Sequence, residues 1–223
     1  LYENEQGVGE AIRESGVPRE EIFVTTKVWN TDQGYDQTLK AFDLSLKKLG
    51  FDYVDLYLVH WPGRDKYIET YKALEKLLAD GYVRAIGVSN FKEHHLEKLM
   101  AETNVVPVVN QVECHPRLQQ TALLEYCTSK GIVLEAWAPL MKGDLDRPVL
   151  VRMAEKYGKT PAQVVLRWNV QRGVIVIPKS VRKERIESNA DIFDFELTAE
   201  EMAEIAAMDE NFRYGKDPDE FLF

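Results

Sequence analysis

The chain has 223 residues, 45% of them hydrophobic, and its 28 basic and 37 acidic side chains give a net charge of −9. This composition supplies enough apolar material for a sizeable core and excludes a disordered chain. An acidic chain without a basic stripe lacks the attraction that dominates binding to phosphate backbones, so we expect no nucleic-acid partner. No apolar run reaches the roughly 20 residues of a membrane span. Two cysteines make no disulfide framework, so we predict a cytoplasmic protein with no membrane partner.

Apolar, β-branched runs alternate with helical patterns along the chain. The first pattern is helical and covers residues 5–15. Strands are predicted at 22–26, 53–59, 82–88, 107–112, 132–137 and 174–178. Helices are predicted at 35–49, 67–80, 92–102, 117–130, 147–157, 161–171 and 181–189. Thr198 and Glu201 have the spacing of a helix N-terminus and predict a closing helix, whereas residues 211–223 look irregular.

The alternation of strands and helices decides the fold class. It predicts right-handed crossovers and a parallel sheet that is buried on both faces. An open dinucleotide-binding sheet would carry a G-x-G-x-x-G turn, but Gly7 and Gly9 follow no strand. We therefore predict an α/β fold of the (β/α)8 TIM barrel type, with residues 1–223 in a single domain. Only six strands are visible and helix 5–15 precedes them, so we expect the given chain to lack the first strand, first helix and second strand.

Barrel enzymes carry their working residues at the carboxyl ends of the strands. The polar residues there are Lys27, His60, Ser89, Asn90, Gln111, Glu113, Lys179 and Ser180. A lysine can snorkel to the surface and a single histidine can be structural, but Lys27 and His60 close neighbouring strands, which favours a site. A positioned lysine can lower the pKa of a tyrosine, and a neutral imidazole can hydrogen-bond a substrate carbonyl. Trp29 and Trp61 follow these two residues closely in the sequence. We predict that they line a substrate pocket, although packing in the core would explain either residue alone.

The last predicted strand and the helix after it have the features of a phosphate site. Lys179 and Ser180 close the strand, and Arg185 and Asn189 lie four residues apart, hence on one helix face. Barrels commonly bind phosphate around their last two strands, where a helix N-terminus adds backbone amides. Lysine and arginine together favour a phosphomonoester over a ribose diol. A solvated basic segment is the alternative, but it accounts less well for a lysine at a strand end.

Two histidine-containing pairs are set aside. His94 and His95 fall on a polar helix face without a carboxylate or cysteine at ligand spacing, so we predict surface residues and no metal site. Cys114 stands beside His115, which suggests a nucleophile. Nothing nearby orients the pair as a triad requires, so we predict a buried structural thiol.

Six segments resemble, in order and spacing, motifs of the aldo-keto reductases. They are LYENEQGVG at 1–9, TTKVW at 25–29, DLYLVHWP at 55–62, IGVSNF at 86–91, NQVE at 110–113 and IPKS at 177–180. The likeness covers the entire chain. It is closest to bacterial members similar to 2,5-diketogluconate reductase and glyoxal or methylglyoxal reductase.

The resemblance implies a catalytic tetrad of Asp, Tyr, Lys and His. Its tyrosine, lysine and histidine map onto Tyr2, Lys27 and His60, and its aspartate is expected shortly before the tyrosine, ahead of Leu1. Tyr2 would donate a proton to the carbonyl oxygen while the nicotinamide delivers hydride to the carbon. Lys27 would ease that proton transfer, and His60 would orient the carbonyl.

The resemblance also implies NADPH as cofactor, with no metal. The residues implied at its 2′-phosphate are Lys179, Ser180, Val181 and Arg185, with Asn189 at the adenine. Those implied at the carboxamide are Ser89, Asn90 and Gln111, with Trp137 stacked on the nicotinamide ring and Leu140 near the pyrophosphate.

We therefore expect an NADPH-dependent enzyme that reduces small aldehydes or ketones, such as methylglyoxal or diketo sugar acids, to alcohols. We expect the complete protein to be a monomer whose partner is a small carbonyl substrate. Two alternatives stay open. One is a truncated or non-catalytic NADPH-binding barrel that acts as a partner or regulatory subunit; the other is a phosphate-binding barrel of different chemistry, such as an isomerase or aldolase.

Overall fold

A computed structural model describes residues 2–64, 66–221 and 223, and these residues fall into two compact units. The first unit runs to Asn110 and includes the last residues from Pro218 onward, and the second is Gln111–Asp217. Within the described residues, no helix is both long enough and apolar enough to span a membrane. The single domain expected over residues 1–223 stays a prediction.

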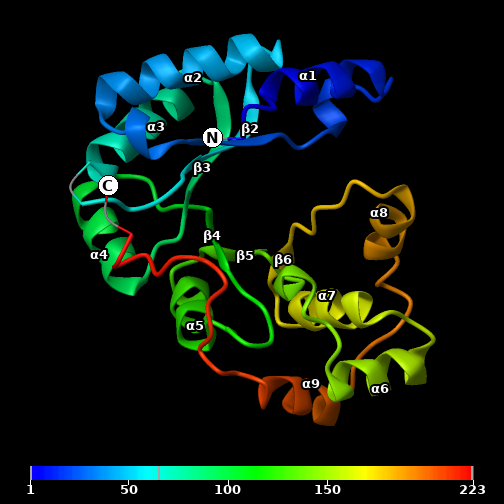
Figure 1. The fold of residues 1–223 in the computed structure, drawn as a ribbon. Coiled ribbons are helices and arrows are strands. Elements are labelled where there is room, and N and C mark those ends of the chain that lie inside the picture. Colours follow the sequence, from blue (N-terminus) through cyan, green and yellow to red (C-terminus); the bar gives the residue numbers. More distant parts are fainter. Residues whose placement is uncertain (1, 65, 222) are drawn as a thin grey trace. The chain divides into compact units, whose positions relative to one another are not determined.

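Strands and helices alternate as predicted (Figure 1). The elements of the first unit are α1 (Glu5–Glu14), β1 (Thr25–Val28), α2 (Tyr35–Leu49), β2 (Val54–Val59), α3 (Tyr67–Ala79), β3 (Val83–Ser89), α4 (Glu93–Glu102) and the start of β4 (Val109–Glu113). The elements that lie wholly in the second unit are α5 (Thr121–Ser129), β5 (Val133–Trp137), α6 (Pro148–Tyr157), α7 (Pro161–Gln171), β6 (Ile175–Val176), α8 (Lys183–Ala190) and α9 (Ala199–Ala206).

The strands of the first unit follow one another in the order β1-β2-β3-β4. β1 and β3 both pair with β2 in parallel, and the register joins Val28 to Val59 and Val59 to Val88. The carboxyl ends of these three strands are therefore level. Side chains just before or after those ends lie along one edge of the sheet, as the barrel prediction requires.

β2 is buried on both faces, as expected for a strand in a parallel sheet covered by helices. Leu56 and Leu58 form a cluster with Val109 on one face. On the other face the Tyr57 ring lies 4.9 Å from the ring of Phe42 in α2. These contacts remove large apolar side chains from water and stabilise the unit.

β1 begins three residues later than predicted because the Ile22 N–H is bound to the Arg19 carbonyl at the end of a 3-10 turn and a side chain takes the N–H of Val24. The Val24 N–H donates to Oδ2 of Asp55 at 2.9 Å, so the strand ladder begins at Thr25. Asp55 is buried and is also paired with Arg19 at 2.8 Å and Arg84 at 2.9 Å. As a result Lys27 lies within β1, at the position before its last residue, and does not follow the strand.

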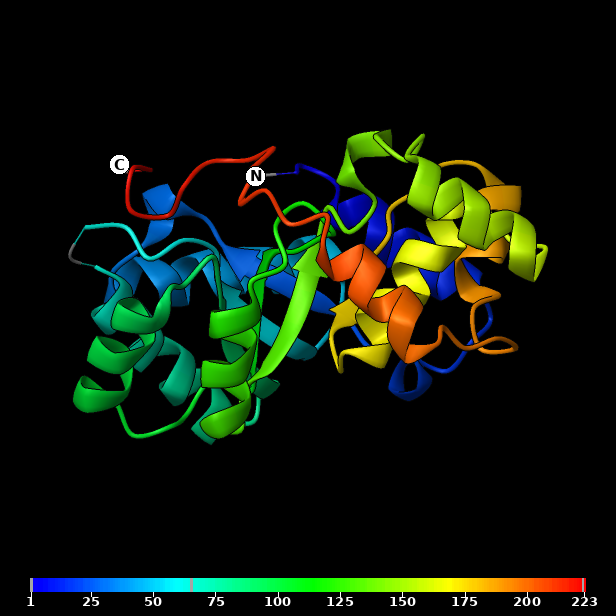
Figure 2. The same ribbon diagram turned by 90° about the horizontal axis from the view of Figure 1, so that it is seen from below.

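In the second unit the strand order is β4-β5-β6, with β5 and β6 parallel. The helices α6, α7 and α9, coloured from yellow-green to orange-red in Figure 2, pack around a buried cluster that includes Leu150, Trp168 and Ile205. α5 begins at Thr121, later than the predicted 117. The residues before it form a turn closed by reciprocal backbone hydrogen bonds between His115 and Leu118.

The closing helix α9 begins where the sequence predicts. The Thr198 Oγ1 accepts a hydrogen bond from the Glu201 N–H at 3.3 Å, and Oε2 of Glu201 accepts one from the Thr198 N–H at 2.9 Å. Both donors would lack an intrahelical partner without these side chains. The capping pair therefore fixes the start of a helix whose Ile205 reaches the core.

We expect Thr198→Ala to lower the free energy of unfolding by about 1 kcal/mol, because one backbone donor loses its partner. Urea unfolding followed by circular dichroism measures the change. The matched control is Thr128→Ala on the exposed side of α5. Equal unfolding midpoints for Thr198→Ala and the wild type would show that the cap contributes nothing.

Candidate functional site

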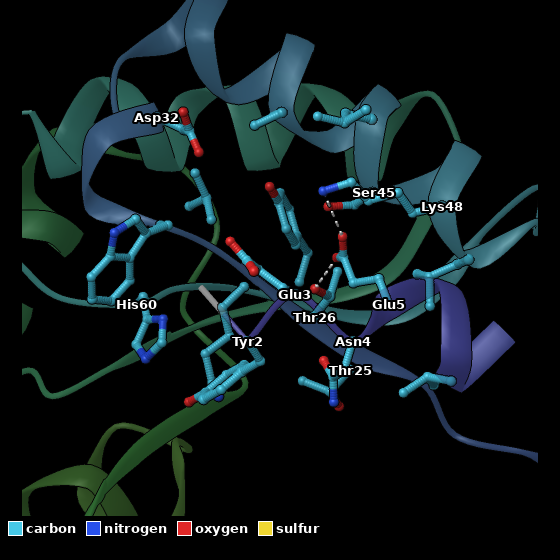
Figure 3. A pocket seen from close by; sticks show the side chains of 18 of the residues that line it. Tyr2, Glu3, Asn4, Glu5, Thr25, Thr26, Asp32, Ser45, Lys48 and His60 are labelled. Atoms are coloured by element: carbon cyan, nitrogen blue, oxygen red, sulfur yellow. Dashed lines mark hydrogen bonds and ion pairs between the residues drawn. The ribbon is translucent and has the colours of Figure 1, made fainter.

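Three of the predicted site residues meet at the carboxyl ends of β1 and β2. Lys27 lies in β1, His60 directly follows β2, and Tyr2 precedes α1. The Tyr2 ring centroid lies 6.0 Å from that of His60 (Figure 3). Nζ of Lys27 lies 5.5 Å from the centroid of the Tyr2 ring. The first unit therefore brings together a phenol, an ammonium and an imidazole that are far apart in the sequence.

These three side chains line a cavity of about 520 Å³ in the first unit. Trp29 also lines it and meets the His60 ring edge-on, with 4.9 Å between centroids. Trp61 is not among the described residues that line this cavity. It is buried, and its ring packs against Phe221 at a centroid distance of 4.7 Å.

The environment sets the protonation states of two of these residues. Burial, assisted by the positive charge of Lys27, lowers the pKa of His60 to about 3, so the imidazole is neutral near pH 7. Partial burial raises the pKa of Tyr2 above its usual value, so the phenol keeps its proton. The lowering of the Tyr2 pKa that Lys27 was expected to cause is therefore not seen, although Tyr2 is 65% exposed.

Two buried residues at the end of β3, Ser89 and Asn90, help to hold the backbone of His60 in place. Asn90 adopts a left-handed backbone conformation with φ of 65°, which directs its side chain back toward β2. Its Nδ2 donates to the His60 carbonyl at 2.9 Å and to the Ser89 Oγ at 3.1 Å. Asn110, which was not expected at the site, exchanges hydrogen bonds with both backbone groups of Phe91. The backbone around the imidazole is therefore held by buried amides.

The other predicted cofactor residues lie in the second unit. Gln111 lies in β4 and its Nε2 donates to Oε1 of Glu135, Trp137 ends β5 half-buried, and Leu140 lies in the loop that follows. The predicted site residues therefore fall into two groups, one in each unit. Tyr2, Lys27, His60, Ser89 and Asn90 belong to the first unit, and Gln111, Trp137, Leu140 and the predicted residues of 179–189 belong to the second.

The segment 179–189 has the chemistry of an anion site. Lys179, Val181 and Arg185 are exposed, and Ser180 and Asn189 are half-buried. The Ser180 Oγ accepts the backbone N–H of residue 182 at 3.1 Å, directly before α8 begins. Exposed basic side chains beside the unpaired amides of a helix N-terminus suit a phosphate group.

His94 and His95 have no carboxylate at ligand spacing in the sequence, but the fold brings one beside them. Asp219 lies beside both, with its Oδ1 3.0 Å from Nε2 of His94 and 3.6 Å from Nε2 of His95. Nζ of Lys92 lies 2.6 Å from the other carboxylate oxygen, so a cation already neutralises the aspartate. Because Lys92 and Asp219 are 127 residues apart, no local spacing could have revealed this ion-pair cluster.

Cys114 is buried, and burial raises the pKa of its thiol to about 11, so it stays protonated near pH 7. The neighbouring His115 directs its Nε2 to Oε1 of Glu113 at 3.1 Å. The thiol therefore lacks the thiolate character that a nucleophile needs.

Comparisons with known proteins agree with this arrangement. The chain matches the model of the aldo/keto reductase family over residues 1–210. It is 59% identical to the glyoxal reductase of Bacillus subtilis (strain 168), covering 100% of this chain and 81% of that relative. Among solved structures, it is similar to MGS-M4, an aldo-keto reductase from a deep-sea metagenome library, with a TM-score of 0.97, 49% identity and coverage of 100% and 84%.

A second solved structure bears on the cofactor. A mutant of Gox0644 in complex with NADPH is similar to this chain with a TM-score of 0.95 and 48% identity, covering 100% of this chain and 82% of that one. The family match, the high identity of the relatives and the arrangement of Tyr2, Lys27 and His60 lead to one conclusion. The chain belongs to the aldo-keto reductase family.

Proposed function

We propose that this protein reduces small aldehydes and ketones to alcohols with NADPH, and that Tyr2, Lys27 and His60 carry the proton chemistry. The family match and the NADPH-bound relative support an NADP-dependent oxidoreductase. The observation that carries the proposal is the meeting of the phenol, ammonium and neutral imidazole at the ends of β1 and β2. The glyoxal reductase relative and a methylglyoxal reductase of Escherichia coli O157:H7, 48% identical to this chain, support small dicarbonyl compounds as the substrate class.

The residues present fit NADPH. The exposed Lys179 and Arg185 and the N-terminus of α8 offer positive charge and amides to a 2′-phosphate, and Asn189 shares a helix face with Arg185. Trp137 offers an indole surface, and Gln111 an amide side chain, for the nicotinamide end. NADPH, when bound, supplies the hydride.

The protein's own contribution is to hold the carbonyl and to supply a proton. Tyr2 keeps its proton near pH 7, so its hydroxyl can donate to the carbonyl oxygen as negative charge develops there. The neutral His60 imidazole donates a hydrogen bond to the same oxygen and fixes its position. Lys27 provides positive charge that stabilises the phenolate left on Tyr2.

No observation on the described residues favours the non-catalytic subunit or a barrel of different chemistry. The cytoplasmic location and the monomeric state stay predictions from the sequence.

Removal of the Tyr2 hydroxyl tests the assigned proton donor. We expect Tyr2→Phe to lower kcat for methylglyoxal by about 100- to 10,000-fold, the range of general acid catalysis, with little change in NADPH affinity. The loss of NADPH absorbance measures the rate, and Tyr35→Phe at the start of α2 is the control. A Tyr2→Phe enzyme as fast as the wild type would refute the role. NADPH binding without turnover by the wild type would instead support the non-catalytic alternative.

The low pKa of His60 predicts how stability depends on pH. The folded-state pKa of about 3 lies below the ordinary 6.5, so the unfolded chain binds the extra proton and stability falls as the pH drops through 6.5 toward 3. Between pH 7 and 5 we expect this residue to account for a loss of about 1–2 kcal/mol. Urea unfolding at both pH values should therefore show a smaller loss for His60→Gln than for the wild type. Equal losses would contradict a buried neutral imidazole.

The phosphate site predicts cofactor selectivity. We expect Arg185→Ala to weaken NADPH binding by about 10- to 150-fold, since a charge-assisted hydrogen bond is lost, and to leave NADH binding unchanged. Fluorescence titration with both cofactors measures the effect. Lys183→Ala on the same helix is the control. An equal loss for NADPH and NADH would place Arg185 away from the 2′-phosphate.

A further inference from the structure

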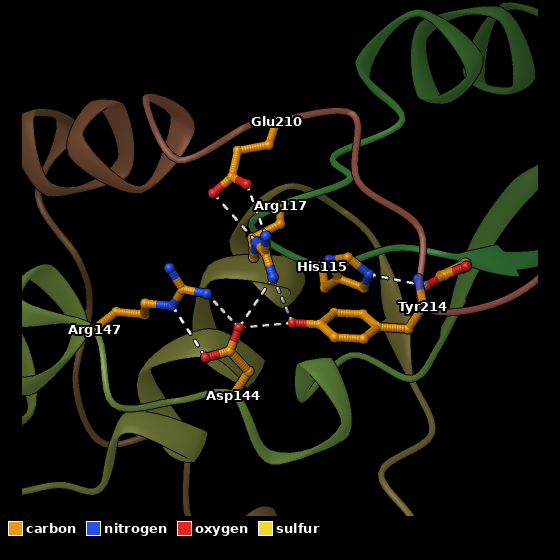
Figure 4. A network of polar contacts seen from close by, with 7 residues as sticks. His115, Arg117, Asp144, Arg147, Glu210 and Tyr214 are labelled. Atoms are coloured by element: carbon orange, nitrogen blue, oxygen red, sulfur yellow. Dashed lines mark hydrogen bonds and ion pairs between the residues drawn. The ribbon is translucent and has the colours of Figure 1, made fainter.

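A short segment after α9 is fastened to the second unit through one tyrosine. We name residues 211–215 the C-terminal strap and residues 138–147, which follow β5, the β5 loop. The Tyr214 hydroxyl donates to Oδ2 of Asp144 at 2.8 Å and accepts from Nη1 of Arg117 at 2.9 Å (Figure 4). The Tyr214 carbonyl accepts from Nζ of Lys142 at 3.0 Å. Two of the three contacts join the strap to the β5 loop.

The strap is also held from the end of β4. The Glu113 side chain is fully buried, and its Oε1 accepts the Tyr214 N–H at 2.7 Å. The Gly215 N–H lies 3.1 Å from Oε2 of the same carboxylate. Burial alone would raise the pKa of Glu113, but its hydrogen bonds to His115 and to the two strap amides outweigh burial and lower the pKa. An ionised carboxylate therefore accepts hydrogen bonds from two backbone N–H groups of the strap.

Arg117 also binds the strap, through its backbone and its side chain. Its carbonyl accepts the Phe212 N–H at 2.9 Å, and its guanidinium lies 4.0 Å from the centroid of the Phe212 ring. The guanidinium is also paired with Glu210 at 2.7 Å and with Asp144 at 3.1 Å. Arg117 thus binds the strap through a backbone hydrogen bond, through the Phe212 ring and through an ion pair with Glu210, which precedes the strap.

The β5 loop needs such support because its own backbone is strained. Ala138, Met141 and Lys142 have φ values of 49°, 51° and 52°, in the left-handed region that side chains with a Cβ disfavour. A residue in this conformation persists only where surrounding contacts hold it. The contacts of Tyr214 with Lys142 and Asp144 are of this kind.

The strap also touches the aromatic residue at the start of the loop. A Cβ added to Gly215 would lie 2.4 Å from Cη2 of Trp137, so the strap backbone packs directly against the indole. The Trp137 carbonyl accepts the Cys114 N–H at 3.4 Å, directly after Glu113. The strap therefore packs against the indole, and the end of β4 binds the backbone of Trp137.

We propose that Tyr214 is a positioning residue for the cofactor. It holds the β5 loop and Trp137 in the conformation that binds NADPH, and so sets the rate at which NADPH leaves. This inference rests on the proposed function, because Trp137 and Leu140 are assigned there to the nicotinamide end and the pyrophosphate. Tyr214 itself is assigned no contact with the substrate or the cofactor.

The test is the NADPH dissociation rate of the full-length protein, followed by stopped-flow fluorescence. We expect Tyr214→Phe, which loses the hydroxyl contacts to Asp144 and Arg117, to release NADPH roughly 3- to 30-fold faster. KM for the carbonyl substrate should not change. Lys142→Met keeps the tyrosine and removes only the contact to its carbonyl, and it should act in the same direction with a smaller effect. Amide hydrogen exchange in the β5 loop should rise in both variants.

The matched control is Tyr157→Phe. The Tyr157 hydroxyl donates to Oε2 of Glu201 at 2.6 Å and its ring packs against Phe195, so the chemistry and the unit are the same but these partners lie outside the β5 loop. It should lower stability and leave NADPH release unchanged. Wild-type release rates in Tyr214→Phe and Lys142→Met, or equal acceleration by Tyr157→Phe, would overturn the inference and leave the proposed function standing. A wild-type protein that binds no NADPH would contradict both the inference and the proposed function.

Discussion

The carboxyl ends of β1, β2 and β3 lie side by side at one edge of the sheet, and this alignment brings the proposed catalytic residues together. The parallel register aligns Val28, Val59 and Val88, so residues next to them in sequence lie at one edge of the sheet. The buried carboxylate of Asp55 acts at the opposite end of β2, where it takes the Val24 N–H and two guanidinium groups. Because a strand cannot slip by one residue without reversing every side chain, this anchor also fixes the direction in which Lys27 points.

The same alignment explains how one small site holds a neutral imidazole beside an ammonium. His60 and Lys27 extend from adjacent strands into a partly dehydrated space, where two positive charges would repel strongly. The imidazole therefore loses its proton and keeps its hydrogen-bonding ability. The amide of Asn90 holds the backbone of His60, so the ring orientation does not depend on a charge of its own.

The sequence predicted the elements well where the signals are local. The bounds of α2 match residue for residue, because Gly50 stops the helix with φ of 70°. The start of β1 was missed because it depends on Asp55, which lies 31 residues further along the chain than Val24. Tyr2, Lys27 and His60 were predicted as a site because each belongs to a recognisable motif, and the structure brings the three side chains together. Tyr214 and Asp219 were not, since their partners lie 70 to 127 residues away and leave no periodic trace.

The fastening of the β5 loop has a consequence for how the protein is made. Asp144 and Tyr214 are separated by 70 residues, so a ribosome that adds about 5–20 residues per second completes the loop about 4–14 s before its tyrosine exists. During that interval the strained loop has no strap to hold it. The nascent chain thus contains Tyr2, Lys27 and His60 early and gains the Tyr214 contacts late, and a chain released before Tyr214 would lack those contacts.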